Sequence, residues 1–126
     1  MRLLLDTPIM LWWLAAPARL ARSERRAITE PANEVWVSAA SLWEAALRRA
    51  RGSLRFDSGE MLQALEADGI RELRVSGHHA LTAGALPAHH DNPLDRLLVA
   101  QAVSEGLTLI TRKHALRAYQ AVLFRR

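Results

Sequence analysis

Three acidic residues stand where a sheet of parallel strands would bring side chains together. Asp6 directly follows the apolar run 3–5, Glu44 lies inside the helical pattern 39–51, and Asp95 falls near the start of the pattern 94–105. Carboxylates that share one cleft raise each other's pKa unless a cation neutralises them. Oxygen ligands favour hard ions such as Mg²⁺ or Mn²⁺, whose usual partner is a phosphate. The three acids therefore predict metal-assisted hydrolysis of a nucleic acid.

Each of these acids also has a purely structural interpretation. Asp is a preferred helix N-cap, so Asp6 is suited to begin the helix that follows it. Ser41 and Glu44 match the spacing of a capping box. Asp95, in the first turn of a helix, would favour the helix dipole without any ligand. Taken one at a time, the residues leave both interpretations open.

The elements that would position these acids alternate along the chain. Short apolar runs, too short for amphipathic hairpins, are separated by segments of helical pattern, which predicts a mainly parallel sheet with helices on both faces, an α/β fold. In such a sheet ligands bind at the carboxyl ends of the strands. The expected strands are 3–5, 35–37, 73–75, 107–110 and 122–124, and the expected helices are 8–14, 23–29, 39–51, 58–68 with Ser58 as cap, 77–86 with Ser76 as cap, 94–105 and 114–119.

The length and composition limit the function classes. The chain has 126 residues, of which half are hydrophobic, so we expect a single domain, 1–126, with a real core. It contains no cysteine, which excludes disulfides, thiolate zinc sites, iron–sulfur clusters and cysteine nucleophiles. Asp6 and Pro8 interrupt the apolar start, and no segment has the length of a transmembrane helix, so we expect a cytoplasmic protein that does not engage a membrane.

The charge balance is basic. Lys and Arg total 17 against 13 Asp and Glu, a net charge of +4, and Lys113 is the single lysine. Arginine presents a planar fork of donors that pairs well with phosphate, which favours a polyanionic partner. A coding bias toward arginine gives the same count, so the charge alone leaves the partner open.

Six segments carry a resemblance to a known family. They read LLLDT (3–7), LWWL (11–14), VSAASLWE (37–44), HHDNPLDRLLVAQA (89–102), LIT (109–111) and ALRAY (115–119). In this order the chain resembles the PIN-domain ribonucleases, specifically the VapC-type toxins of toxin–antitoxin pairs, from residue 2 to about residue 119.

The resemblance implies an α/β/α sandwich and a metal-dependent endoribonuclease that forms a homodimer and is neutralised by a VapB-type antitoxin. It places Asp6, Glu44 and Asp95 at the first three acidic positions of the metal site, with Mg²⁺ or Mn²⁺ as the ion and RNA as the substrate. His89 and His90 fall in the loop before Asp95, where we expect surface residues rather than catalytic ones.

The chain departs from the family pattern after its late strand. Relatives commonly read Thr-x-Asp there, whereas this chain has Thr111, Arg112 and Lys113. Three acids balance one divalent ion better than two, so we expect one Mg²⁺. We expect Thr111 and Lys113, with Arg96, to contact a phosphate or a water.

The sequence leaves one alternative function open and argues against another. The lysine in place of the acid also fits an inactive PIN-like module that binds antitoxin or RNA without cutting it. A phosphorelay receiver is set aside, because Ser38 and Ser76, rather than an aspartate, follow the central strands 35–37 and 73–75.

Overall fold

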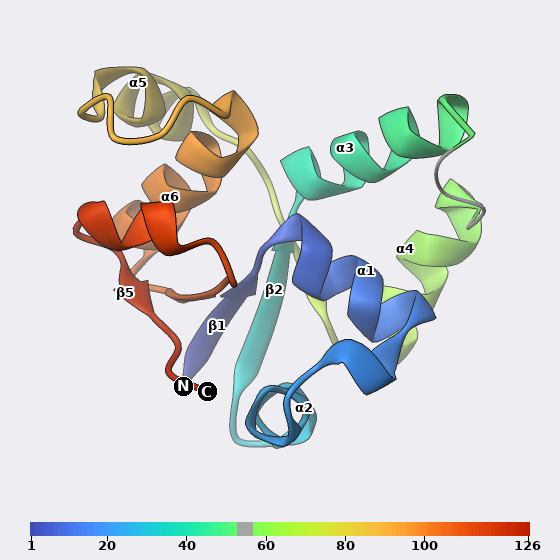
Figure 1. Ribbon diagram of the computed structural model, residues 1–126. Helices are drawn as coiled ribbons and strands as arrows, with labels where there is room; N and C mark the ends of the chain where they lie inside the picture. Colours follow the sequence, from blue (N-terminus) through green and yellow to red (C-terminus); the bar gives the residue numbers. More distant parts are fainter. Residues whose placement is uncertain (53–56) are drawn as a thin grey trace.

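The computed structural model describes residues 1–52 and 57–126, and its strands form one parallel sheet (Figure 1). The spatial order is β3-β2-β1-β4-β5, and every neighbouring pair runs parallel. The strands are β1 (Arg2–Leu5), β2 (Glu34–Ser38), β3 (Arg71–Leu73), β4 (Thr108–Ile110) and β5 (Val122–Leu123). Because β1 is the central strand, the residue that follows it lies at the middle of the side of the sheet where the parallel strands end.

Helices cover both faces of this sheet, as the alternating pattern predicts. In Figure 1, α1 to α4 lie to one side of the strands, and α5 and α6 lie to the other. The helices are α1 (Thr7–Ala15), α2 (Arg22–Thr29), α3 (Ala39–Ala50), α4 (Ser58–Ala67), α5 (Gly77–Ala85) and α6 (Pro93–Glu105), with short 3₁₀ helices η1 (Pro17–Arg19) and η2 (His114–Ala118). The α/β/α sandwich is therefore confirmed.

The core divides into two layers because side chains alternate along a strand. Leu3 and Leu5 of β1 pack in one cluster with residues of α1 to α4, and the intervening Leu4 packs in the other with Leu98 and Val99 of α6. All three leucines are fully buried. Burial on both faces explains why three consecutive residues of this strand, 3–5, are apolar.

Three local predictions need correction. Asp57, not Ser58, caps α4, because its carboxylate accepts hydrogen bonds from the N–H groups of the two residues after Ser58. Strand β3 begins and ends two residues earlier than 73–75, because its register on β2 ends at the Ser38–Leu73 pair and residues 74 and 75 do not pair with β2. The segment 114–119 forms a 3₁₀ helix rather than an α-helix.

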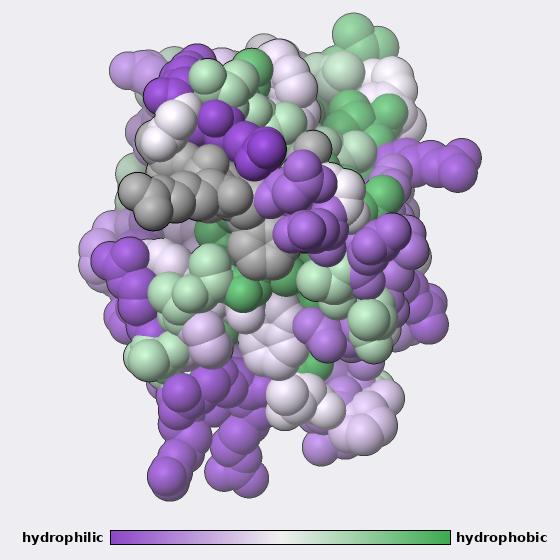
Figure 2. Space-filling view, turned by 90° about the vertical axis from the view of Figure 1, so that its right-hand side faces the viewer, coloured by the Kyte–Doolittle hydropathy of each residue, from purple (hydrophilic) through white to green (hydrophobic). Residues whose placement is uncertain are grey.

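The surface over the α1 to α4 side is mixed in character. Figure 2 shows hydrophobic residues there in small groups between hydrophilic ones. Among the large apolar side chains, Trp43 on α3 is 59% exposed. Within the described residues, no helix combines the length and apolar character needed to span a membrane.

Candidate active site

Asp6 and Thr111 lie together at the carboxyl ends of two paired strands. The last residues of β1 and β4, Leu5 and Ile110, are register partners. The backbone N–H of Asp6 donates to the carbonyl oxygen of Ile110 at 3.0 Å, which extends the pairing beyond the strands. The sheet thus brings a carboxyl and a hydroxyl group to one edge, where parallel sheets bind ligands.

The two carboxylate oxygens of Asp6 differ. Oδ1 accepts a hydrogen bond from the N–H of Ile9 at 2.9 Å, so Asp6 does cap α1, one of the two interpretations that the sequence left open. Oδ2 is buried and has no hydrogen-bond partner. Burial raises the pKa of Asp6 to about 6, against the opposing effects of the Thr111 hydroxyl, the Ile9 N–H and the Lys113 ammonium. A cation against Oδ2 would favour the ionised carboxylate.

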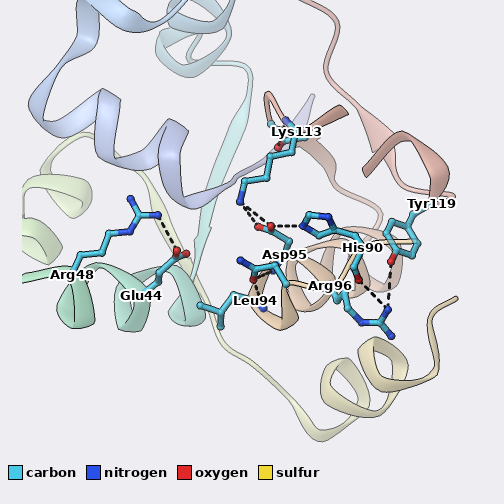
Figure 3. Close-up of polar contacts among 10 residues, drawn as sticks. Glu44, Arg48, His90, Leu94, Asp95, Arg96, Lys113 and Tyr119 are labelled. Atoms are coloured by element: carbon cyan, nitrogen blue, oxygen red, sulfur yellow. Dashed lines mark hydrogen bonds and ion pairs between the residues drawn. The ribbon is translucent and has the colours of Figure 1, made fainter. Parts of the chain in front are cut away.

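Asp95 is, by contrast, fully engaged. Asn92 caps α6 and accepts from the N–H of Asp95, which places the acid in the first turn. The Lys113 ammonium donates to both carboxylate oxygens at 2.8 Å, and Nε2 of His90 lies 2.8 Å from Oδ2. Figure 3 shows Lys113 and His90 pointing at Asp95 from different sides.

Lys113 therefore supplies a positive charge between two acids. Its own backbone N–H donates to the Thr111 hydroxyl at 3.1 Å, a tight turn directly after β4. Its ammonium holds Asp95 and also lowers the pKa of Asp6, although burial of Asp6 is the larger effect. A compact ammonium in this position acts as an internal counter-ion to the carboxylates.

Glu44 is held apart from this pair. Its Oε2 accepts a hydrogen bond from Arg48, one turn further along α3, at 2.9 Å (Figure 3). In the part of the chain that the structure describes, no three His, Cys, Asp or Glu residues are grouped closely enough to hold a metal ion. Glu44 therefore does not join Asp6 and Asp95 in this arrangement.

The capping box predicted for Ser41 and Glu44 is wrong. The N-cap of α3 is Ser38, whose hydroxyl accepts from the N–H of Ala40 at 3.0 Å. Ser41 lies inside the helix, and its buried hydroxyl accepts a hydrogen bond from the Thr7 hydroxyl at 2.9 Å. The helix begins directly after β2, which leaves Ser41 too far along to cap it.

Comparison with known protein families decides the family. The sequence model of the family described as the PIN domain matches residues 3–121 of this chain. The chain belongs to the PIN domain family. "Ribonuclease VapC22" of Mycobacterium tuberculosis is 36% identical over 120 residues, which cover 93% of this chain and 91% of that protein.

Solved structures have the same fold as this PIN domain. A VapBC2 complex of Rickettsia felis, bound to a DNA fragment from its promoter, matches with a TM-score of 0.73 at 14% identity, over 99% of this chain and 98% of that one. A toxin–antitoxin complex from Klebsiella pneumoniae matches with a TM-score of 0.67 at 20% identity, over 96% and 95%. The expected PIN-like fold is confirmed.

PIN-domain nucleases in general depend on a metal ion, and two acids of this PIN domain carry oxygen atoms of the type that such an ion binds. The partnerless Oδ2 of Asp6 and the neighbouring carboxylate of Asp95 offer the oxygen ligands that a hard cation prefers. Lys113 already occupies both oxygens of Asp95, so an ion at this site would compete with the ammonium. Among the described residues, Asp6 and Asp95 are the acids that this arrangement brings together, and Lys113 holds one of them.

Arg96, which we expected to contact phosphate, instead donates hydrogen bonds to other groups of the PIN domain. Its guanidinium donates at 2.9 to 3.4 Å to four backbone carbonyls and one hydroxyl. The acceptors are the carbonyls of Ala83, Leu86, Pro87 and His90 and the hydroxyl of Tyr119. Arg96 thus holds the loop that places His90 against Asp95.

Two features near the site were missed from the sequence. His90 contacts Asp95 although its position indicated only a surface loop. Arg112 donates from Nε to the buried Glu24 of α2 at 3.1 Å and lies over the Trp12 ring. Burial acts to raise the pKa of Glu24, but the hydrogen bonds and charge of Arg112 outweigh it and the pKa is lowered. No local spacing signals a pair that joins residues this far apart.

Proposed function

We propose that this chain is an endoribonuclease toxin that hydrolyses RNA phosphodiester bonds and is neutralised by a VapB-type antitoxin. The observation that carries the proposal is the buried, partnerless Oδ2 of Asp6 beside Asp95, at the carboxyl ends of the central strands. The printed name of the Mycobacterium tuberculosis relative supports ribonuclease activity, and the structural neighbours that are toxin–antitoxin complexes support the antitoxin.

Asp6 and Asp95 would hold one Mg²⁺ or Mn²⁺ ion. Glu44 would complete the set of acids by leaving Arg48. Once bound, the ion supplies positive charge for a phosphate oxygen and lowers the pKa of a bound water. Thr111, at the same strand edge, would orient a water or a phosphate oxygen.

Lys113 has a second role in this proposal. An ammonium that gives up Asp95 to a metal ion is free to contact a phosphate oxygen as a point charge. Its side chain is about one-third exposed, so it can turn toward a bound substrate. His90 would then keep one hydrogen bond to Asp95 and hold that carboxylate in place.

A second candidate function is a module that binds RNA or antitoxin without cutting. The observation in its favour is the contact of Lys113 with both oxygens of Asp95 at 2.8 Å. If no metal ion displaces that ammonium, both oxygens of Asp95 stay engaged, and Asp95 cannot hold an ion that activates water.

Metal titration by calorimetry, paired with an RNA cleavage assay, separates the two functions. For a nuclease, the native chain binds Mg²⁺ or Mn²⁺ and cuts total bacterial RNA, and Asp6→Asn loses both properties. For a binding module, the native chain does neither, and Lys113→Asp gains metal binding. A native chain that cuts RNA in the presence of a chelator would contradict the metal-dependent mechanism.

The homodimer and the cytoplasmic location remain part of the proposal. The resemblance to VapC-type toxins supports both. Light scattering on the purified chain at several concentrations measures the oligomeric state, and a monomer at every concentration would contradict the homodimer.

A further inference from the structure

A basic groove adjoins the candidate active site. It has a volume of about 950 Å³ and is formed by the segment after β4, by η2, by the C-terminal residues 121–126 and by Ala21. No Asp or Glu belongs to its lining within the described residues. Its cationic residues are Arg112, Lys113, Arg117, Arg125 and Arg126. The groove is therefore positively charged along its length.

Most of this charge is not neutralised by neighbouring acids. Arg112 is paired with Glu24, and Lys113 is paired with Asp95. Arg117 and Arg125 make no ion pair with any described residue. Five cations against those two acids leave an excess of three, compared with +4 for the entire chain. The groove thus holds most of the excess charge of the molecule.

The groove and the candidate active site share residues. Thr111 and Lys113 line the groove, and the same two residues act on the carboxylates of Asp6 and Asp95. Asp6 and Asp95 themselves do not line the groove, so Thr111 and Lys113 are the residues that connect it to the two acids. A strand that binds there would be aligned with the site that is proposed to cut it.

We propose that this groove binds the phosphate backbone of a single RNA strand, with Arg117 and Arg125 as its phosphate contacts. The inference rests on the proposed nuclease function and adds the path of the substrate. Proteins that bind single strands use a positively charged groove that follows the backbone. The volume matches that of a small-ligand pocket and so suits a few nucleotides rather than a duplex.

Phosphate fits these side chains better than an acidic peptide does. A guanidinium binds two oxygens of one phosphate in a planar fork, and successive phosphates present such oxygens at regular intervals. The groove also shares Thr111 and Lys113 with the pair of acids at which a phosphodiester would be hydrolysed. Binding of an acidic peptide would not require the groove to adjoin this pair of acids.

The test measures binding without cleavage. The probe is a fluorescently labelled 12-nucleotide single strand of 2′-O-methyl RNA, and its anisotropy is followed in chelator at several salt concentrations. Each phosphate contact contributes about 0.7 to the slope of log affinity against log salt, which is about fivefold in affinity at 0.1 M salt. Arg117→Ala and Arg125→Ala should each lose about fivefold, and the double variant about 25-fold.

A matched control removes the same charge elsewhere. Arg51→Ala with Arg74→Ala deletes two exposed arginines outside the groove, and we expect the affinity to change less than about twofold. An equal loss in the control would overturn the proposal, because affinity would then follow net charge alone. Arg117 and Arg125 are exposed, so the variants should fold, and their melting temperatures check this.

Two further measurements distinguish RNA from an acidic protein segment, and the groove proposal from the nuclease proposal. A 12-residue polyglutamate peptide that binds as tightly as the RNA and depends on the same arginines would overturn RNA in favour of an acidic protein segment. The binding assay does not depend on cleavage. A chain that binds RNA through Arg117 and Arg125 but does not cut it would contradict the nuclease function and would still support RNA binding in the groove. A chain that cuts RNA but binds independently of these arginines contradicts only the groove.

Discussion

Two adjacent residues after β4, Arg112 and Lys113, each neutralise a buried acid, but the two pairs serve different regions of the molecule. Arg112 reaches Glu24 on α2. Glu24 is only 1% exposed, and its carboxylate also accepts a hydrogen bond from the N–H of Ala21. Lys113 reaches Asp95, a carboxylate near enough to Asp6 to act on its pKa. The first pair joins a helix to the sheet, and the second controls the charge of a site. Burial of an ion pair alone therefore does not reveal a functional site.

The largest effect is expected at the structural pair. Arg112→Ala leaves the carboxylate of Glu24 buried without its cation, and we expect the free energy of unfolding to fall by about 3 kcal/mol. Urea denaturation at pH 7 measures this loss. The double variant Arg112→Ala/Glu24→Ala is the control and should recover part of it, since no uncompensated charge remains. A loss below about 1 kcal/mol in the single variant would contradict the comparison.

A smaller effect of opposite sign is expected at Asp6. Its raised pKa means that the folded state binds more protons than the unfolded state between about pH 4 and pH 6, so stability falls as the pH rises through this window. Asp6→Asn keeps a capping oxygen and removes the buried charge. In chelator at pH 7.5 we expect it to be more stable than the native chain by about 2 kcal/mol.

Thermal or urea unfolding across the pH range checks this prediction. Near pH 4 the Asp6→Asn variant and the native chain should differ little, because the native carboxyl is then protonated in the folded state. Equal stability of the two proteins at pH 7.5 would mean that Asp6 is already compensated, and its unsatisfied oxygen would lose its significance.

Lys113 should affect metal affinity more than stability. Lys113→Met frees both oxygens of Asp95 and leaves the hydrogen bond to His90. We expect the affinity for Mn²⁺ to rise at least about tenfold, which corresponds to about 1.4 kcal/mol, because the ion no longer competes with an ammonium. Calorimetry measures the change, and Arg117→Met is the control for general loss of charge. Unchanged affinity would show that Lys113 does not compete with the metal ion.

The smallest effect is expected at Glu44. Its contact with Arg48 is an i,i+4 pair on a helix surface, so Glu44→Gln should change the free energy of unfolding by no more than about 0.5 kcal/mol. If Glu44 also moves to the metal ion, the same variant should lose RNA cleavage. Full cleavage by Glu44→Gln would restrict the site to Asp6 and Asp95.

The sequence predicted those parts of the molecule that depend on local pattern. The buried strand β1 and the apolar stripe of α6 place Asp6 and Asp95 as expected, because burial on two faces and a helical period leave a clear signal. Side-chain partners were less predictable. Lys113 on Asp95 and Arg112 on Glu24 depend on the turn after β4, whose direction no periodic pattern encodes. The cap of α4 was predicted at Ser58, whereas the adjacent Asp57, a residue type that caps equally well, provides it.

Arg96 explains how the loop before α6 can keep its shape while its side chains change. Four of its five hydrogen bonds go to backbone carbonyls, a group that every amino acid carries. The loop is therefore recognised by its main chain, from a helix that also bears Asp95. A substitution between residues 83 and 90 leaves these carbonyl acceptors in place, whereas a lysine at position 96 would lack the planar fork that reaches so many acceptors at once.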